Sequence, residues 1–230
     1  MPESGRERKE LLATLFGDRV AFACGDPTEP QSPALPEEEA LLAGAAEHRC
    51  REFRSGRAAA HEALTALGVS RAPLLKGPRG EPRWPAGFVG SISHGETLSA
   101  AVVARSSDYA GLGLDVETDA PVSQAFARRV CSQRELQRCA DLGEPETLAR
   151  VVFSAKESVY KLQYPLTQTV VYWSALEILL NSGNFSARFL NACPPFRMEQ
   201  VLHGSWVRGQ GVILTGLALA TSPGDSNHGE

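Results

Sequence analysis

The chain has 230 residues, of which 43% are hydrophobic and 22% are charged, and its formal net charge at pH 7 is −4. This length allows a full hydrophobic core, in one domain or in two closely packed halves. The acidic balance argues against general nucleic-acid binding, and no apolar run approaches the ~20 residues of a membrane-spanning helix. Because the charged N-terminus lacks a signal-peptide core, we expect a soluble, cytoplasmic protein without nucleic-acid or membrane partners.

Five cysteines are spread widely along the chain, and no two of them form a Cys-x-x-Cys pair. An odd number without paired spacing indicates neither a disulfide framework nor a zinc site. We therefore predict reduced thiols that contribute to the packing of the interior.

The first third of the chain predicts two helices and two loops. Residues 25–36 hold four prolines and form a surface loop, after which Pro36 and the acidic residues behind it begin a helix that reaches about His48. An alanine-rich helix follows over 51–67, and the glycine behind it can take the left-handed conformation that ends a helix. Residues 73–90 mix proline, glycine and charge, which is typical of a shaped binding loop.

The rest of the chain mixes short strands with helices. Ser132 begins a helix, because Ser-x-x-Glu has the form of a capping box, and a second helix covers 149–163. The predicted strands lie at 88–93, 99–104, 111–117, 172–180, 184–190 and 211–220, the fourth and fifth forming a hairpin. This order favours the α+β class over alternating βαβ units, and residues 222–230 have the composition of a disordered tail.

Residues 111–117, Gly-Leu-Gly-Leu-Asp-Val-Glu, alternate apolar side chains with small or acidic ones. As a strand they place Asp115 and Glu117 together, on the face opposite the leucines. Two neighbouring carboxylates repel each other unless a cation lies between them, and such oxygen ligands suit Mg²⁺ together with substrate phosphates. An isolated Asp-x-Glu is more often a solvated strand end, so this segment alone does not establish a metal site.

The predicted helix over 149–163 carries a second charged group. Glu157 and Lys161 are four residues apart and share one helix face, with Lys156 at its edge, so we expect a third carboxylate and two ammonium groups to project together. A surface ion pair worth about 0.3–0.5 kcal/mol explains the same spacing.

Basic side chains gather in two further places. Ser93 and His94 end a predicted strand and follow a loop that carries Lys76 and Arg79, a combination able to bind a phosphate through charge-assisted hydrogen bonds. A lone histidine more often satisfies a local partner. The second cluster consists of Arg49, Arg51, Arg54, Arg57 and His61. Exposed helix arginines ordinarily only solvate the surface.

Three segments in this order resemble the 4′-phosphopantetheinyl transferases, in particular the branch that serves siderophore, polyketide and nonribosomal peptide synthetases. They are KGPRGEPRWPAGFVGSISH, GLGLDVE and FSAKESVYK, and the last two have the separation usual in the family. The resemblance implies two similar α+β halves in a pseudo-twofold arrangement, 1–117 and 118–221, with coenzyme A in the cleft between them.

The same resemblance implies an activity. A magnesium-dependent holo-carrier-protein synthase transfers the 4′-phosphopantetheine group of coenzyme A to a serine of an apo acyl or peptidyl carrier protein and releases 3′,5′-ADP. At this chain length the family favours a monomer. Phe153 stands where many relatives have tryptophan and Ser158 where many have alanine. Neither position carries a reacting group, so we expect an active enzyme.

Carried over residue by residue, the resemblance assigns the site. The Mg²⁺ ligands are Asp115, Glu117 and Glu157. The catalytic residues are Glu157, as the candidate base for the serine proton, with Lys156 and Lys161 near the pyrophosphate. The coenzyme A-binding residues are Arg49, Arg57, Lys76, Gly77, Pro78, Arg79, Ser93 and His94, of which His94 is expected near the 3′-phosphate.

Carrier proteins of these pathways tend to present an acidic helix beside the serine, so we predict a basic docking surface. Its residues are Arg128, Arg129, Arg134 and Arg138. Two alternatives remain for the activity. One is a magnesium-dependent hydrolase that uses the same carboxylates with water as the nucleophile, and the other is a noncatalytic protein that binds coenzyme A or a carrier. The complete set of charged residues argues against the second alternative.

Overall fold

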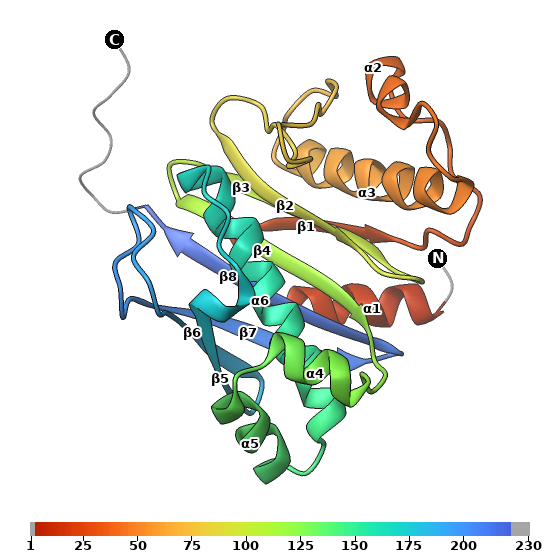
Figure 1. Ribbon diagram of the computed structural model, residues 1–230. Coiled ribbons are helices and arrows are strands. Elements are labelled where there is room, and N and C mark those ends of the chain that lie inside the picture. The colour runs from red at the N-terminus through yellow and green to blue at the C-terminus, as the bar shows by residue number, and fades with distance from the viewer. Residues whose placement is uncertain (1–2, 222–230) are drawn as a thin grey trace.

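The computed structural model describes residues 3–221, which form two antiparallel sheets with helices packed against them (Figure 1). The strand orders are β1–β3–β2 and β4–β8–β7–β6–β5. The strands are β1 (Ala21–Gly25), β2 (Phe88–His94), β3 (Ser99–Arg105), β4 (Tyr109–Thr118), β5 (Leu176–Asn181), β6 (Asn184–Phe189), β7 (Val201–Gly209) and β8 (Val212–Ala220). The helices are α1 (Glu3–Ala13), α2 (Pro36–Glu39), η1 (Ala40–Leu42), α3 (Glu47–Ala66), α4 (Gln124–Val130), α5 (Gln133–Asp141), α6 (Pro145–Thr167) and η2 (Trp173–Ala175). The predicted α+β class is confirmed.

The predicted strands correspond to β2 to β6 and β8, and β5 and β6 form the expected hairpin. The strand predicted over 172–180 begins only at Leu176, because Trp173–Ala175 form η2. The helix expected to run from Pro36 to His48 is wrong, because α2 and η1 end by Leu42 and α3 begins only at Glu47. Gly44 lies between them with a φ of +76°, a left-handed conformation that interrupts a helix. No helix or strand was predicted for α1, β1, α4 or β7, and the expected tail lies outside the described residues.

Two predicted helix ends are confirmed by their local geometry. Ser132 is the N-cap of α5, where its hydroxyl accepts the Glu135 N–H and the Glu135 carboxylate accepts the Ser132 N–H. Gly68 follows α3 with a φ of +80°. The long helix α6 begins earlier than predicted because Pro145 occupies its first turn, where a missing N–H costs no helical hydrogen bond.

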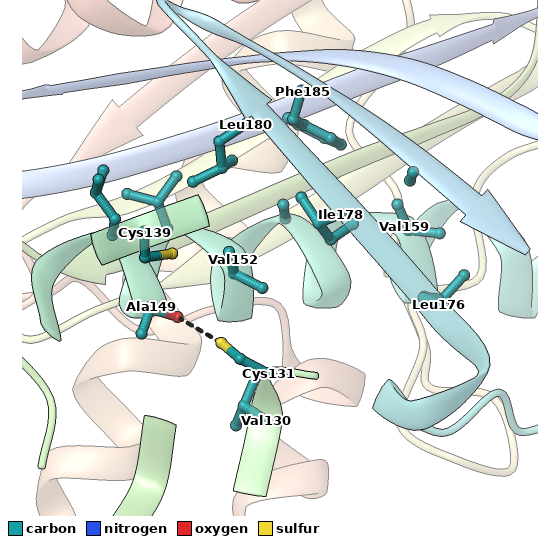
Figure 2. Close-up of a cluster of buried hydrophobic side chains, with 14 of the residues drawn as sticks. Val130, Cys131, Cys139, Ala149, Val152, Val159, Leu176, Ile178, Leu180 and Phe185 are labelled. Carbon is teal, nitrogen blue, oxygen red and sulfur yellow. Dashed lines mark hydrogen bonds between the residues drawn. The ribbon is translucent and has the colours of Figure 1, made fainter. Parts of the chain in front are cut away.

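Three groups of buried side chains hold these layers together. One lies between α3 and β1–β3, the second joins α1 to the two sheets, and the third lies between α6 and the five-stranded sheet. Figure 2 shows part of the third group, in which Cys131 Sγ lies 3.9 Å from the carbonyl oxygen of Ala149. All five thiols are free, and four of them are buried. No described helix has both the length and the apolar character needed to cross a membrane.

The two sheets meet where β2 packs beside β4, and two serine hydroxyls of β2 accept hydrogen bonds from the backbone of β4. Ser91 Oγ accepts the backbone N–H of Leu114, and Ser93 Oγ accepts that of Val116, each at 3.1 Å. These hydroxyls satisfy buried donors of β4 that have no strand partner on that side. The strand that carries Ser93 and His94 is therefore fixed beside the strand that carries the predicted carboxylates.

Candidate active site

The helix α6 packs closely on β4 because of Gly113. A Cβ atom at this position would lie 2.0 Å from the carbonyl oxygen of Ser158, so only glycine allows the approach. The polar residues of α6 that face β4 and β8 recur at helical spacing, and they are Arg150, Ser154, Glu157 and Lys161. This spacing places them beside the acidic face of β4.

Lys161 joins the acidic strand to β2. Its Nζ lies 2.7 Å from Asp115 Oδ1 and 2.7 Å from Ser93 Oγ. Ser93 Oγ also lies 3.0 Å from Asp115 Oδ1, to which it donates its proton, since it accepts from Lys161 and from the Val116 N–H. The structure thus brings together residues that the sequence placed in three separate segments.

One oxygen of each predicted carboxylate ligand is held by a protein donor. Asp115 Oδ1 is held by Lys161, Glu117 Oε2 lies 2.9 Å from Arg150 NH1, and Glu157 Oε1 lies 2.6 Å from Trp173 Nε1. Within residues 3–221 the other oxygen of each carboxylate accepts no hydrogen bond, and Asp115 Oδ2 is buried. The three side chains are therefore oriented while each keeps one oxygen available.

The carboxylates also influence one another. Burial raises the pKa of Glu117 and of Glu157, and the charge of Asp115 raises both further. The hydrogen bond from Arg150 lowers the pKa of Glu117, the hydrogen bond from Trp173 lowers that of Glu157, and the charge of Lys161 lowers both. Three His, Cys, Asp or Glu side chains close enough to form a complete metal cage do not occur among the described residues. Mg²⁺ is usually held by one or two carboxylates with waters and substrate phosphates, so this all-oxygen set with a buried, unpartnered Asp115 oxygen fits that ion.

Lys156 does not project with Glu157 and Lys161, and that expectation is wrong. Its side chain is 1% exposed, and its Nζ lies 2.9 Å from Glu135 Oε2 and 2.9 Å from the carbonyl oxygen of Val130. Adjacent residues of an α-helix point about 100° apart, which turns Lys156 toward α4 and α5 instead of β4.

Four of the predicted coenzyme A-binding side chains line one hollow of about 160 Å³: Arg49, Arg57, Lys76 and His94. The hollow lies beside α3, the loop after Leu74 and the end of β2. Phe53 also lines the hollow, and the centroid of its ring lies 4.7 Å from both the Arg57 guanidinium carbon and Lys76 Nζ. Ser93 is separated from this group, since its hydroxyl bonds Asp115.

Arg49, Arg57 and Lys76 outnumber the one acid that lines this hollow, Glu52, which lies 2.8 Å from Arg49 NH1, so we call it the basic hollow. Burial lowers the pKa of Lys76, and the nearby Arg57 and Arg49 lower it further. Burial likewise lowers the pKa of His94, again with Arg49, whose NH1 lies 2.9 Å from His94 Nε2. A neighbouring positive charge lowers the pKa of Lys76 and of His94 because it destabilises their protonated, positively charged forms. An anion bound among these groups would reduce that repulsion.

The loop after Lys76 has a defined conformation. The Gly77 N–H donates to the Glu81 carbonyl at 2.7 Å, and the Arg79 N–H donates to Glu81 Oε2 at 2.9 Å. A Cβ atom on Gly77 would lie 1.9 Å from Glu81 Oε1, so the glycine leaves space for that carboxylate. Arg79, which belongs to this loop, lines two further hollows.

Two further hollows, of about 220 and 500 Å³, continue from the basic one. The first shares Gly80, Pro82 and Ile92 with the basic hollow, and it also contains Lys161. The second shares Arg79, Glu157 and Tyr160 with the first and extends to Arg129 and Trp173. We call the three together the trough, which runs from His94 past Glu157 to Arg129.

Sequence reasoning missed Arg150, Tyr160 and Trp173. The polar spacing from Arg150 to Lys161 on α6 was a signal that Arg150 shares the site face. Trp173 follows the helix in a turn, and no local pattern connects it with Glu157.

Comparison with known proteins shows the family to which the chain belongs. The model of the 4′-phosphopantetheinyl transferase N-terminal domain matches residues 37–104, and that of the 4′-phosphopantetheinyl transferase superfamily matches residues 111–215. The 4′-phosphopantetheinyl transferase Svp of Streptomyces mobaraensis is 38% identical over 205 residues, which cover 86% of this chain and 83% of Svp.

Two further relatives are similar over most of their length. The 4′-phosphopantetheinyl transferase PptT of Mycobacterium tuberculosis is 33% identical over 226 residues, covering 91% of this chain and 96% of PptT. Enterobactin synthase component D of Salmonella typhi is 32% identical over 198 residues, covering 83% and 81%. The chain belongs to the 4′-phosphopantetheinyl transferase superfamily, whose members use coenzyme A and transfer its 4′-phosphopantetheine group to carrier proteins.

Proposed function

We propose that this chain transfers 4′-phosphopantetheine in the trough, for carrier proteins of polyketide, nonribosomal peptide or siderophore biosynthesis. The observation that carries the proposal is the contact of Lys161 with Asp115 and Ser93, midway between the basic hollow and Arg129. This contact supports the proposal because Lys161 lines the trough together with Glu157 and also bonds Asp115, so that a cation and two carboxylates lie close to the space proposed for the pyrophosphate.

Coenzyme A is proposed to bind with its 3′-phosphate in the basic hollow. Arg49, Arg57, Lys76 and His94 supply positive charge and donors there, and Gly77, Pro78 and Arg79 form the adjoining loop. The pyrophosphate then lies near Lys161. The phosphopantetheine arm continues past Tyr160 toward Trp173, into the hollow of about 500 Å³.

Mg²⁺ is proposed to bind among Asp115, Glu117 and Glu157, with water and the pyrophosphate completing its ligands because the three side chains form no closed cage in the described structure. There it would neutralise the pyrophosphate and polarise its oxygens. Lys161 holds Asp115 and adds a second positive charge at the pyrophosphate. The serine oxygen attacks the β-phosphorus, the bond to the 3′,5′-ADP oxygen breaks, and the serine proton passes to Glu157 Oε2. Glu157 is assigned as the base because it lines the trough beside Lys161, and not from its pKa, which a bound cation would lower.

The pseudo-twofold arrangement is proposed from two repeated features. In each sheet the first strand pairs with the last, which pairs in turn with the strand before it, as in β1–β3–β2 and β4–β8–β7. In each half, a buried glutamate before the long helix accepts two backbone N–H groups and meets a side chain of that helix. The partners are Leu35, Leu74 and His61 for Glu38, and Ser132, Ile178 and Lys156 for Glu135.

This repeat favours a boundary between the halves before β4, since β4 pairs with β8, whereas the sequence placed it at 117. One chain then contributes both walls of the trough, which supports the predicted monomer. Light scattering coupled to size exclusion tests that state, and a dimer as the active form would contradict it.

The carrier is proposed to dock on the basic residues near the Arg129 end of the trough. Arg129 lines the trough, and Arg134 and Arg138 line a neighbouring groove with Glu177 and Leu179. Charge complementarity to an acidic helix motivates this surface. Reversal of charge at Arg134 and Arg138 should raise the KM for the carrier and leave the KM for coenzyme A unchanged. An unchanged carrier KM contradicts the surface.

The activity is tested by incubating the protein with Mg²⁺, coenzyme A and an apo carrier protein and weighing the carrier by intact mass spectrometry. A gain of about 340 Da, the mass of one phosphopantetheine, that disappears in Asp115→Ala supports the transferase and its acidic site. Cleavage of coenzyme A without a gain in mass favours the hydrolase. Bound but intact coenzyme A with every carrier favours the noncatalytic binder.

A further inference from the structure

Trp173 holds Glu157 from outside its own helix. The indole Nε1 lies 2.6 Å from Glu157 Oε1, and an indole nitrogen can only donate. A hydrogen bond to a charged carboxylate is shorter and stronger than one between neutral groups. Because Trp173 begins η2, between α6 and β5, this bond links the carboxylate to a second element of the fold.

The ring of Trp173 is itself fixed by packing. It meets Phe153 edge to face, with centroids 5.5 Å apart, and Phe153 meets Phe126 of α4 in the same way at 5.2 Å. Phe153 and Glu157 are four residues apart on α6 and share one face. A ring packed against Phe153 therefore presents its N–H to Glu157, one turn further along the helix.

The bond has a consequence for the carboxylate. Glutamate has a flexible side chain, and the neighbouring Asp115 repels it, so Glu157 without a donor would have several orientations available. With Oε1 bound to Trp173, Oε2 is the oxygen that has no hydrogen-bond partner within residues 3–221.

We infer that Trp173 is a positioning residue, which orients Glu157 so that Oε2 is available to the divalent cation. The inference rests on the proposed function and deepens it. In this role Trp173 acts through Glu157, and its indole nitrogen accepts no proton.

The test compares two matched variants. Trp173→Phe keeps an aromatic ring against Phe153 and removes the N–H. Trp206 lies on β7, away from the trough, and its indole N–H donates to the Asn181 carbonyl oxygen at 2.9 Å. Trp206→Phe removes this N–H. Both variants lose one indole hydrogen bond, and only one of these bonds ends on Glu157.

Two properties are measured in each variant. Mn²⁺ affinity in the presence of coenzyme A is followed by electron paramagnetic resonance, and kcat and KM are measured with an apo carrier. Loss of a residue that orients a metal ligand typically costs 10- to 100-fold in affinity or activity. In Trp173→Phe we expect Mn²⁺ affinity and kcat to fall about tenfold each, with the KM for coenzyme A within about twofold of wild type.

Trp206→Phe is expected to retain the wild-type values of both. Equal Mn²⁺ affinity and equal kcat in the two variants overturn the inference. A loss in Trp173→Phe that is accompanied by a lower melting temperature and weaker coenzyme A binding also overturns it, because that pattern indicates a structural role. If the wild-type protein modifies no carrier, the Mn²⁺ comparison alone still decides the inference, so its failure is distinguishable from failure of the proposed function.

Discussion

Lys161 of α6 and Asp115 of β4 form an ion pair of 2.7 Å whose ammonium group also reaches Ser93 of β2. The contact connects the two sheets at the centre of the trough. Asp115 is nearly buried, whereas Lys161 remains partly exposed. A cation in this position serves the site in two ways, since it compensates a buried carboxylate and faces the space proposed for the pyrophosphate.

Replacement of Lys161 by methionine should lower kcat/KM for coenzyme A by about 100-fold, the usual cost of removing one charged or hydrogen-bonding group at a developing negative charge. Lys9→Met is the control, because it breaks an exposed pair with Glu62 of similar chemistry far from the trough. Steady-state kinetics with an apo carrier measure both variants. Retention of more than about a third of the activity in Lys161→Met would contradict the proposed role.

Local periodicity predicted which acidic residues share a face, whereas their assignment to one site came from the resemblance to the family. Alternation on the strand places Asp115 and Glu117 on one face, and four-residue spacing on the helix places Glu157 above Lys161. The basic hollow was also accessible, through the charges of its loop and helix. Lys156 was misplaced because its direction depends on a buried partner, Glu135, that lies on another helix.

Lys156 and Glu135 provide a second prediction, which concerns stability. Each side chain is 1% exposed, so Lys156→Met leaves a buried carboxylate without its cation. Removing one member of a buried pair typically lowers the free energy of unfolding by about 3–5 kcal/mol. Urea denaturation measures the loss, and Lys156→Met with Glu135→Gln should recover part of it. A single variant as stable as wild type would show that the pair is not structurally important.

Gly113 provides a third prediction, for the approach of α6 to β4. A Cβ atom 2.0 Å from the backbone oxygen of Ser158 requires the helix to move, because neither partner is a flexible side chain. Gly113→Ala should therefore lower the free energy of unfolding by about 1–3 kcal/mol and reduce activity as well. Gly17→Ala is the control, since a Cβ atom there meets nothing within 4 Å. Equal stability of the two variants in thermal denaturation would contradict the close approach.

The features that the sequence did not predict depend on long-range contacts. The strand β1 is short and lies in the chain before a proline-rich loop, and it becomes a strand by pairing with β3. The bond from Trp173 to Glu157 requires η2 to fold back over α6, and the pairing of Arg150 with Glu117 crosses from helix to strand. Local propensity carries no information about such pairs.

The last prediction concerns acid stability through Glu39, at the end of α2. Its carboxylate accepts both Nε and NH2 of Arg54 at 2.8 Å, and these hydrogen bonds lower the pKa of Glu39 from its ordinary 4.5 to about 2. A carboxylate with a lowered pKa stabilises the fold fully above its unfolded pKa and loses that contribution as the pH falls. Glu39→Gln should therefore be less stable than wild type at pH 6, and the difference should shrink below pH 4.5 and vanish near pH 2. Glu37→Gln, an exposed acid of the same helix, is the control, and denaturant midpoints across this range measure all three proteins. A difference between Glu39→Gln and wild type that stays constant from pH 6 to pH 2 would show that the Arg54 pair does not lower the pKa of Glu39.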